Sequence, residues 1–232
     1  MEHFVLIPGL LCTQALFAPQ MPMLARHGTT QVADTTRDDT IDAMAERLLA
    51  DAPEGALSLV GLSMGGYVAL EVARRAPDRV RRLALLDTSA RPDAPEASET
   101  RRRLVALAEA GRFEEVIDLL WQRLPAPDRL GDAALRAIVS GMARAVGPDA
   151  FARQQRAIMA RADQRPRLPT LEMPTLVLVG ESDAITPPEV AQEMAEAIAW
   201  ATLTRVPACG HLSTLERPER VEAALAAWLA AT

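Results

Sequence analysis

The stretch Gly61-Leu62-Ser63-Met64-Gly65-Gly66 connects an apolar run, residues 57–60, to a helical pattern over residues 64–76. The motif is G-x-S-x-G between a predicted strand and a predicted helix, the context in which it presents a serine nucleophile. Its small residues permit a sharp, strained turn and leave the hydroxyl at a helix N-terminus, where the dipole favours developing negative charge. Alternatively, the glycines form a turn that only joins strand to helix.

The rest of the chain alternates between short apolar runs and helical patterns. Strands are expected at residues 4–7, 31–34, 57–60, 80–86, 175–179 and 202–206, and helices at 15–27, 40–51, 64–76, 187–199 and 218–231. Such alternation is typical of a parallel sheet with helices on both faces. The sequence therefore predicts an α/β fold.

Residues 91–167 interrupt this alternation. The segment contains four helical patterns, near residues 96–110, 112–123, 130–145 and 148–162, and no convincing strand. We expect an all-helical cap over the carboxyl edge of the sheet, where ligands bind in folds of this kind. Residues 1–90 and 168–232 then form the core, and 91–167 is an insertion in the same structural unit.

A serine hydroxyl needs a base to become a nucleophile near neutral pH. Of the three histidines, His211 is the best placed, because it follows the last predicted strand and precedes the last helix. His3 begins the first strand, and His27 is expected to end a helix. His211 is therefore the predicted base, although a lone histidine in such a loop can also be structural.

The base in turn needs an acid to orient it. Two aspartates follow strands at the same edge of the sheet, Asp183 after residues 175–179 and Asp87 after residues 80–86. We favour Asp183, and Asp87 is the alternative; a loop aspartate can also bond only to nearby backbone amides. The order Ser63, Asp183, His211 is the one found in α/β hydrolases.

The oxyanion of an acyl-transfer intermediate needs backbone N–H donors. We predict the amides of Met64, the residue after the nucleophile, and Leu10, in the loop after the first strand. A largely apolar pocket is expected beside them, suited to short or medium acyl chains rather than charged polymers. Its predicted lining is Leu11, Trp121, Met142, Phe151, Ile158 and Met159.

Composition excludes several other functions. The net charge of −6 argues against nucleic acid and anionic membrane surfaces as partners. All 25 basic residues are arginine, so neither a Schiff-base lysine nor a P-loop lysine exists. Cys12 and Cys209 have no zinc spacing and are expected to be packed thiols. The N-terminus lacks a signal pattern, so a cytoplasmic location is expected.

Four stretches together resemble the bacterial α/β-hydrolase superfamily, in particular small carboxylesterases similar to the pimeloyl-[acyl-carrier protein] methyl ester esterase group. They are residues 7–12 (IPGLLC), 61–67 (GLSMGGY), 180–187 (GESDAITP) and 210–211 (GH). The resemblance implies the α/β-hydrolase fold. Because the chain begins at the strand before the oxyanion loop, we expect a mainly parallel sheet of six strands, two fewer than in larger members.

These observations predict a carboxylesterase-type serine hydrolase that forms an acyl-enzyme on Ser63 and needs no cofactor or metal. The same triad also serves lactone, thioester or carbon–carbon bond cleavage, and a non-catalytic receptor can share the scaffold. A small-molecule ester is the expected partner, and the chain is expected to be a monomer or a homodimer. The run Arg101-Arg102-Arg103 is either the solvated face of a helix or a docking site for an acidic acyl-carrier protein.

Overall fold

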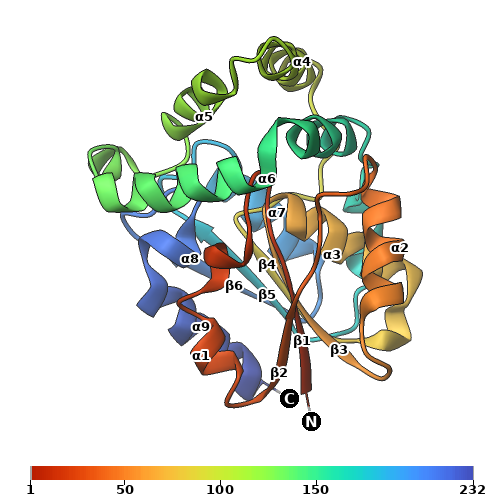
Figure 1. The fold of residues 1–232 in the computed structure, drawn as a ribbon. Coiled ribbons are helices and arrows are strands. Elements are labelled where there is room, and N and C mark those ends of the chain that lie inside the picture. The colour runs from red at the N-terminus through yellow and green to blue at the C-terminus, as the bar shows by residue number, and fades with distance from the viewer. Residues whose placement is uncertain (1, 232) are drawn as a thin grey trace.

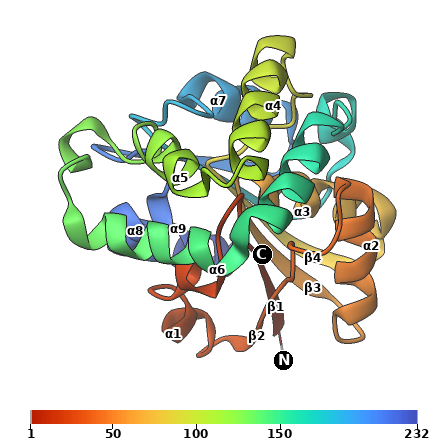
Figure 2. The same ribbon diagram turned by 45° about the horizontal axis from the view of Figure 1, so that its top comes forward.

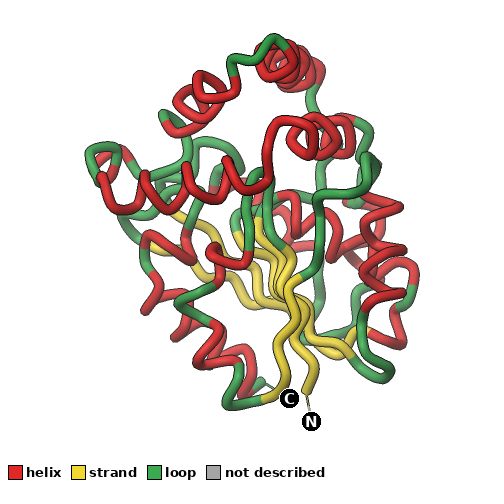
Figure 3. The backbone as a smooth tube through the Cα atoms, in the orientation of Figure 1, coloured by secondary structure: helices red, strands yellow, loops and turns green. Residues whose placement is uncertain are grey.

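A computed structural model describes residues 2–231 as one sheet of six parallel strands with helices on both faces (Figures 1 and 3). The strand order is β2-β1-β3-β4-β5-β6, and every neighbouring pair is parallel. The strands are β1 (Glu2–Ile7), β2 (Gly28–Val32), β3 (Leu57–Leu62), β4 (Val80–Leu86), β5 (Thr175–Gly180) and β6 (Ala201–Val206). The predicted six-stranded α/β fold is confirmed.

The sheet is covered on both faces because successive side chains of a strand point to opposite sides. In β1, Val5 and Ile7 belong to the core on the face covered by α2 (Ile41–Asp51), α3 (Met64–Arg75) and α7 (Pro188–Ala197). Phe4 and Leu6 belong to the core on the other face, which α1 (Met21–Leu24) and α9 (Pro218–Ala230) cover. A parallel strand buried on both faces reads as a continuous apolar run, which is why the sequence identifies these strands clearly.

Helices α4 (Pro95–Glu109), α5 (Phe113–Trp121) and α6 (Ala133–Met159) come between β4 and β5 in the chain. They lie over the carboxyl ends of the strands, at the opposite end of the molecule from the start of β1 (Figures 1 and 2). Helix α6 joins the two segments predicted at 130–145 and 148–162 across a kink at Gly147, whose φ is 80°. We call residues 91–167 the helical insertion.

Two of the predicted elements are wrong in their bounds. Residues 15–27 do not form one helix but a 3₁₀ turn, Gln14–Phe17, and the short α1. Pro19 and Pro22 prevent a continuous helix here, because proline has no N–H to donate and its ring clashes with the preceding turn. His27 consequently lies in the turn before β2. The strand expected at 31–34 is Gly28–Val32, an edge strand whose partial exposure weakens the apolar pattern.

The remaining elements are short. They are α8 (Ser213–Glu216) and three further 3₁₀ turns, Pro77–Arg79, Pro127–Arg129 and Arg165–Thr170. Within residues 2–231, no helix is both long enough and apolar enough to cross a membrane.

Backbone strain gathers at the carboxyl edge of the sheet. Among the described residues, four that are not glycine have positive φ, namely Leu11 after β1, Ser63 after β3, Asp87 after β4 and Ala208 after β6. Such residues cost free energy and persist only where their surroundings hold them, commonly at functional sites. The edge beneath the helical insertion is therefore where a site is expected.

Candidate active site

Ser63 stands on the sharp turn between β3 and α3, with φ 55° and ψ −117°. The turn brings the two chain segments so close that a Cβ on Gly65 would lie 1.9 Å from the carbonyl oxygen of Ile7. The backbone is fixed from both sides, since the Ser63 amide donates to the Leu86 carbonyl and the Thr88 hydroxyl donates to the Ser63 carbonyl. The hydroxyl of Ser63 is thereby held at the start of α3.

The imidazole of His211 lies between Ser63 and Asp183. Its Nε2 is 2.9 Å from the Ser63 hydroxyl oxygen, and its Nδ1 is 2.8 Å from Oδ2 of Asp183. With the proton on Nδ1, the ring donates to the carboxylate and accepts from the hydroxyl, the polarity that a general base requires. The structure thus brings the three predicted residues together, although they come from distant parts of the chain.

The Asp183 carboxylate is fixed by its own loop. Its Oδ1 accepts from the amides of Ile185 and Thr186, and its Oδ2 accepts from the Thr186 hydroxyl. Burial alone would raise the pKa of Asp183, but the charge and hydrogen bond of His211 and the amide donors hold it below its usual value. Burial lowers the pKa of His211, but the charge and hydrogen bond of Asp183, together with the charges of Asp87 and Glu216, outweigh burial, so the net pKa is raised.

Asp87, the alternative acid, has other partners. Its Oδ1 accepts from the Gly180 amide at 2.9 Å and its Oδ2 from the Ser213 amide at 3.3 Å. The carboxyl is completely buried, and burial together with the nearby charge of Asp183 raises its pKa to about 8. Asp87 therefore links the loops that carry Asp183 and His211, while Asp183 makes the hydrogen bond to the imidazole.

Glu216 holds the loop of His211 in place, a role that the sequence analysis missed. Its carboxylate is 2% exposed and accepts from the amides of Gly210 and Leu212, on either side of His211, and from the amide of Ala126 in the helical insertion. A Cβ on Gly210 would lie 2.4 Å from the Ala126 nitrogen. The insertion and the histidine loop are thus locked together. A single glutamate at the end of a four-residue helix gives no sequence signal for this role.

Replacing Glu216 with glutamine should loosen this loop. An amide NH₂ would face backbone N–H donors, so the free energy of unfolding should fall by about 1–3 kcal/mol. Because small displacements of a base are costly, kcat for an ester should fall by about tenfold to a hundredfold with little change in KM. Urea unfolding and steady-state kinetics test both effects.

Glu219→Gln is the matched control, because Glu219 is exposed on α9, three residues along the chain. It should change neither quantity appreciably. Equal behaviour of the two variants would contradict the positioning role of Glu216.

The two predicted oxyanion donors have free amides. Within residues 2–231, neither the Leu10 N–H nor the Met64 N–H has a hydrogen-bond acceptor. The loop that carries Leu10 is tied to α6, because the Leu11 amide donates to Oε1 of Gln154, whose Nε2 donates to the Thr35 carbonyl. An amide without a partner beside a candidate nucleophile is available to a developing oxyanion.

Comparison with known proteins agrees with this geometry. A family model described as alpha/beta hydrolase fold matches residues 2–218. The chain belongs to the α/β-hydrolase family. Among curated relatives of this hydrolase, a pimeloyl-[acyl-carrier protein] methyl ester esterase from Aromatoleum aromaticum is 31% identical over 211 residues, which cover 85% of this chain and 82% of the relative.

Solved structures of other α/β hydrolases superpose closely on this one. A thermophilic esterase from Thermogutta terrifontis is 32% identical, with a TM-score of 0.90 and coverage of 99% of this chain and 90% of that chain. The enol-lactonase from Burkholderia xenovorans LB400 is 26% identical, with a TM-score of 0.89 and coverage of 99% and 91%.

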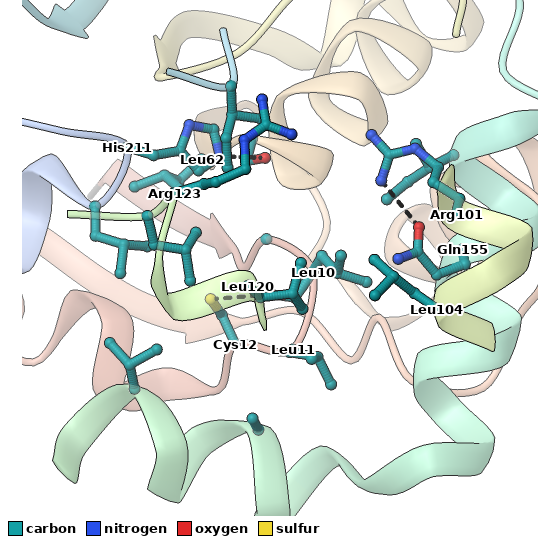
Figure 4. A pocket seen from close by; sticks show the side chains of 18 of the residues that line it. Leu10, Leu11, Cys12, Leu62, Arg101, Leu104, Leu120, Arg123, Gln155 and His211 are labelled. Atoms are coloured by element: carbon teal, nitrogen blue, oxygen red, sulfur yellow. Dashed lines mark hydrogen bonds between the residues drawn. The ribbon is translucent and has the colours of Figure 1, made fainter. Parts of the chain in front are cut away.

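A pocket of about 160 Å³ opens above Ser63 and His211 in this α/β hydrolase (Figure 4). Most of its lining is apolar and comes from the loop after β1 and from the helical insertion. Of the residues predicted to line it, Leu11 and Ile158 do so, and Leu10 also contributes its side chain. Further apolar lining comes from Leu104, Ile117, Leu120, Leu124 and Val139.

The other four residues predicted for the pocket lie outside its lining. Phe151 packs within the insertion, its ring centroid 5.8 Å from that of Phe113. Trp121 is buried and donates from its indole nitrogen to the Leu130 carbonyl. Met142 is buried and its sulfur accepts from the Thr13 amide, whereas Met159 is half-buried at the end of α6. Phe151 and Trp121 therefore bond or pack within the insertion, and Met142 connects the insertion to the segment after β1.

Four polar side chains in the lining were not predicted, namely Thr100, Arg101, Arg123 and Gln155. Of the run Arg101-Arg102-Arg103, only Arg101 turns inward, while Arg102 and Arg103 are exposed. The sequence does contain a signal for this. Leu104 and Ala108 follow Arg101 at i+3 and i+7, which places Arg101 on the apolar face of α4.

Both cysteines are buried near the site. Burial raises the pKa of the Cys12 thiol to about 12, and it raises the pKa of Cys209 further. A thiol that remains protonated is a poor nucleophile. The structure therefore agrees with the prediction of packed thiols.

Proposed function

We propose that this chain hydrolyses carboxylic esters of small or medium acyl groups, with Ser63 as nucleophile, His211 as general base and Asp183 as the orienting acid. The observation that carries the proposal is the continuous hydrogen-bond chain from Ser63 through His211 to Asp183 beneath an apolar pocket. The names of the relatives, two esterases and an enol-lactonase, support the same class of chemistry.

The proposed reaction has two acyl-transfer steps. Ser63 attacks the ester carbonyl while His211 takes the hydroxyl proton, and the Leu10 and Met64 amides receive the oxyanion. The protonated imidazole, stabilised by Asp183, gives the proton to the departing alkoxide, and the acyl group remains on Ser63. Water then attacks the acyl-enzyme with the same assistance, so that the carboxylic acid leaves and the hydroxyl is regenerated.

A substrate panel tests this proposal. p-Nitrophenyl esters, lactones and acyl-CoA or carrier-linked thioesters are compared by kcat/KM, and a fluorophosphonate probe with peptide mapping identifies the labelled residue. We expect turnover of esters to exceed that of thioesters, and we expect the label on Ser63. A chain that neither turns over any ester nor reacts with the probe is not an esterase but a binding protein on this scaffold.

A further inference from the structure

The end of the pocket farthest from the candidate triad is polar. His211 and Arg123 lie at one side of the cavity, whereas Arg101 of α4 and Gln155 of α6 lie at the other (Figure 4). Nη1 of Arg101 donates to Oε1 of Gln155 at 2.9 Å. Because leucines line the space between the two ends, a pair of polar side chains there needs an explanation.

Gln155 is completely buried, and its amide nitrogen has no hydrogen-bond acceptor within residues 2–231. Arg101 can only donate, so the amide oxygen must face it and the NH₂ group is turned toward the interior of the pocket (Figure 4). Leaving a buried donor unpaired is costly. An acceptor atom of a ligand in the pocket would satisfy this donor.

The surroundings of this donor carry an excess of positive charge. The carboxylate of Asp93 pairs with Nε of Arg101 at 3.2 Å and with Nη1 of Arg161 at 2.8 Å. Arg161 lies behind the pocket wall, with its guanidinium carbon 4.5 Å from the ring centroid of Tyr67, which lines the cavity. Two guanidinium groups thus share one carboxylate, and the group of three carries a net charge of +1.

We propose that Arg101 and Gln155 form a subsite for a carboxylate at the far end of the acyl chain, so that the substrates are monoesters of dicarboxylic acids. This rests on the proposed ester hydrolysis and adds the substrate class. A carboxylate fits better than a neutral group, because the subsite offers donors only and the net charge favours an anion. The leucines between the two ends contact the methylene groups of the chain.

The test compares two homologous series of substrates: monomethyl esters of straight-chain dicarboxylic acids, and methyl esters of monocarboxylic acids of equal carbon number. The acid released by hydrolysis is measured by titration with base at constant pH. At the best length, kcat/KM should be about ten- to a hundredfold higher for the ester that bears the carboxylate, because hydrogen bonds to charged groups have this strength. A preference of this size tests the subsite directly.

Gln155→Glu adds a negative charge to the subsite with almost no change in the shape of the side chain. The new carboxylate pairs with Arg101 and repels the substrate anion, so kcat/KM for the charged ester should fall by about tenfold or more. The fall for the neutral ester should be smaller, so the ratio of the two kcat/KM values should decrease. Gln155→Leu, which removes the donor without adding charge, should also reduce the preference and serves if the first variant folds poorly.

Arg103→Gln is the matched control, because it removes one positive charge from the same helix on its exposed side. It should leave the preference between the two esters unchanged. Equal turnover of charged and neutral esters at every length, or a preference unaffected by Gln155→Glu, overturns the subsite while ester hydrolysis stands. Failure to turn over either series removes the proposed function itself, and the subsite with it.

Discussion

Replacing Ser63 with alanine is expected to reduce kcat for ester hydrolysis by at least about 10,000-fold, because the acyl-enzyme can no longer form. The methyl of alanine fits where the serine Cβ already lies, and among residues 2–231 the hydroxyl bonds only to His211. The fold should therefore be retained, with near-native circular dichroism and thermal unfolding. Initial rates with the best p-nitrophenyl ester measure the effect.

Ser182→Ala is the control for this experiment. Ser182 lies next to Asp183 in sequence, and its backbone amide, not its hydroxyl, is what bonds to the Cys209 carbonyl. This variant should retain nearly full activity. If Ser63→Ala kept a substantial part of the turnover, or if a fluorophosphonate probe still labelled it, the nucleophile would have to be sought elsewhere.

The position of the candidate triad could be predicted because the ends of the strands that carry it are easy to recognise in the sequence. Ser63 and Asp183 each follow a short, mostly apolar run that ends at a glycine, and such runs are buried parallel strands. His211 follows β6, an edge strand that contains polar residues and is only partly buried. Parallel strands bring their carboxyl ends to one edge. Residues in the loops after separate strands must therefore lie near one another, whatever their separation in sequence.

The lining of the pocket could not be predicted as well, because some apolar residues of the helical insertion pack within it and others line the cavity, and the sequence does not distinguish the two. Phe151 and Ile158 are both apolar and seven residues apart, hence on the same side of α6. They are nevertheless about 10 Å apart along the helix axis. Phe151 consequently packs on Phe113 within the insertion, while Ile158 reaches the cavity.

The roles of the buried polar side chains also could not be predicted from the sequence. Glu216, Gln154 and Gln155 are each completely or almost completely buried, yet their types are common on exposed surfaces. Only the three-dimensional structure shows which backbone amides they meet, or, for Gln155, that one donor meets none.

Asp183→Asn should reduce kcat by about 10,000-fold with little effect on the fold. The asparagine amide can donate to Nδ1 of His211, which favours the tautomer with its proton on Nε2. That tautomer cannot accept the proton of Ser63, so the base is lost although the geometry remains.

The pH profile gives this prediction a second readout. His211 acts as a base only when neutral, so kcat/KM of the wild-type chain should rise with pH through the pKa of His211. Burial lowers this pKa, and Asp183 raises it above the ordinary value of about 6.5. Without the carboxylate at position 183, the largest influence that raises the pKa of His211 is lost, and the midpoint of the residual activity should move to lower pH.

The variant Asp87→Asn distinguishes the role of Asp87 from that of Asp183. Asp87 accepts from the Gly180 and Ser213 amides, and an asparagine there keeps one acceptor oxygen. Its effect on kcat should be less than about tenfold, the size of one neutral hydrogen bond. If Asp87→Asn instead matched the loss in Asp183→Asn and shifted the pH profile in the same way, the carboxylate after β4 would be the acid that supports His211, and the hydrogen bond of Asp183 to the imidazole would be structural.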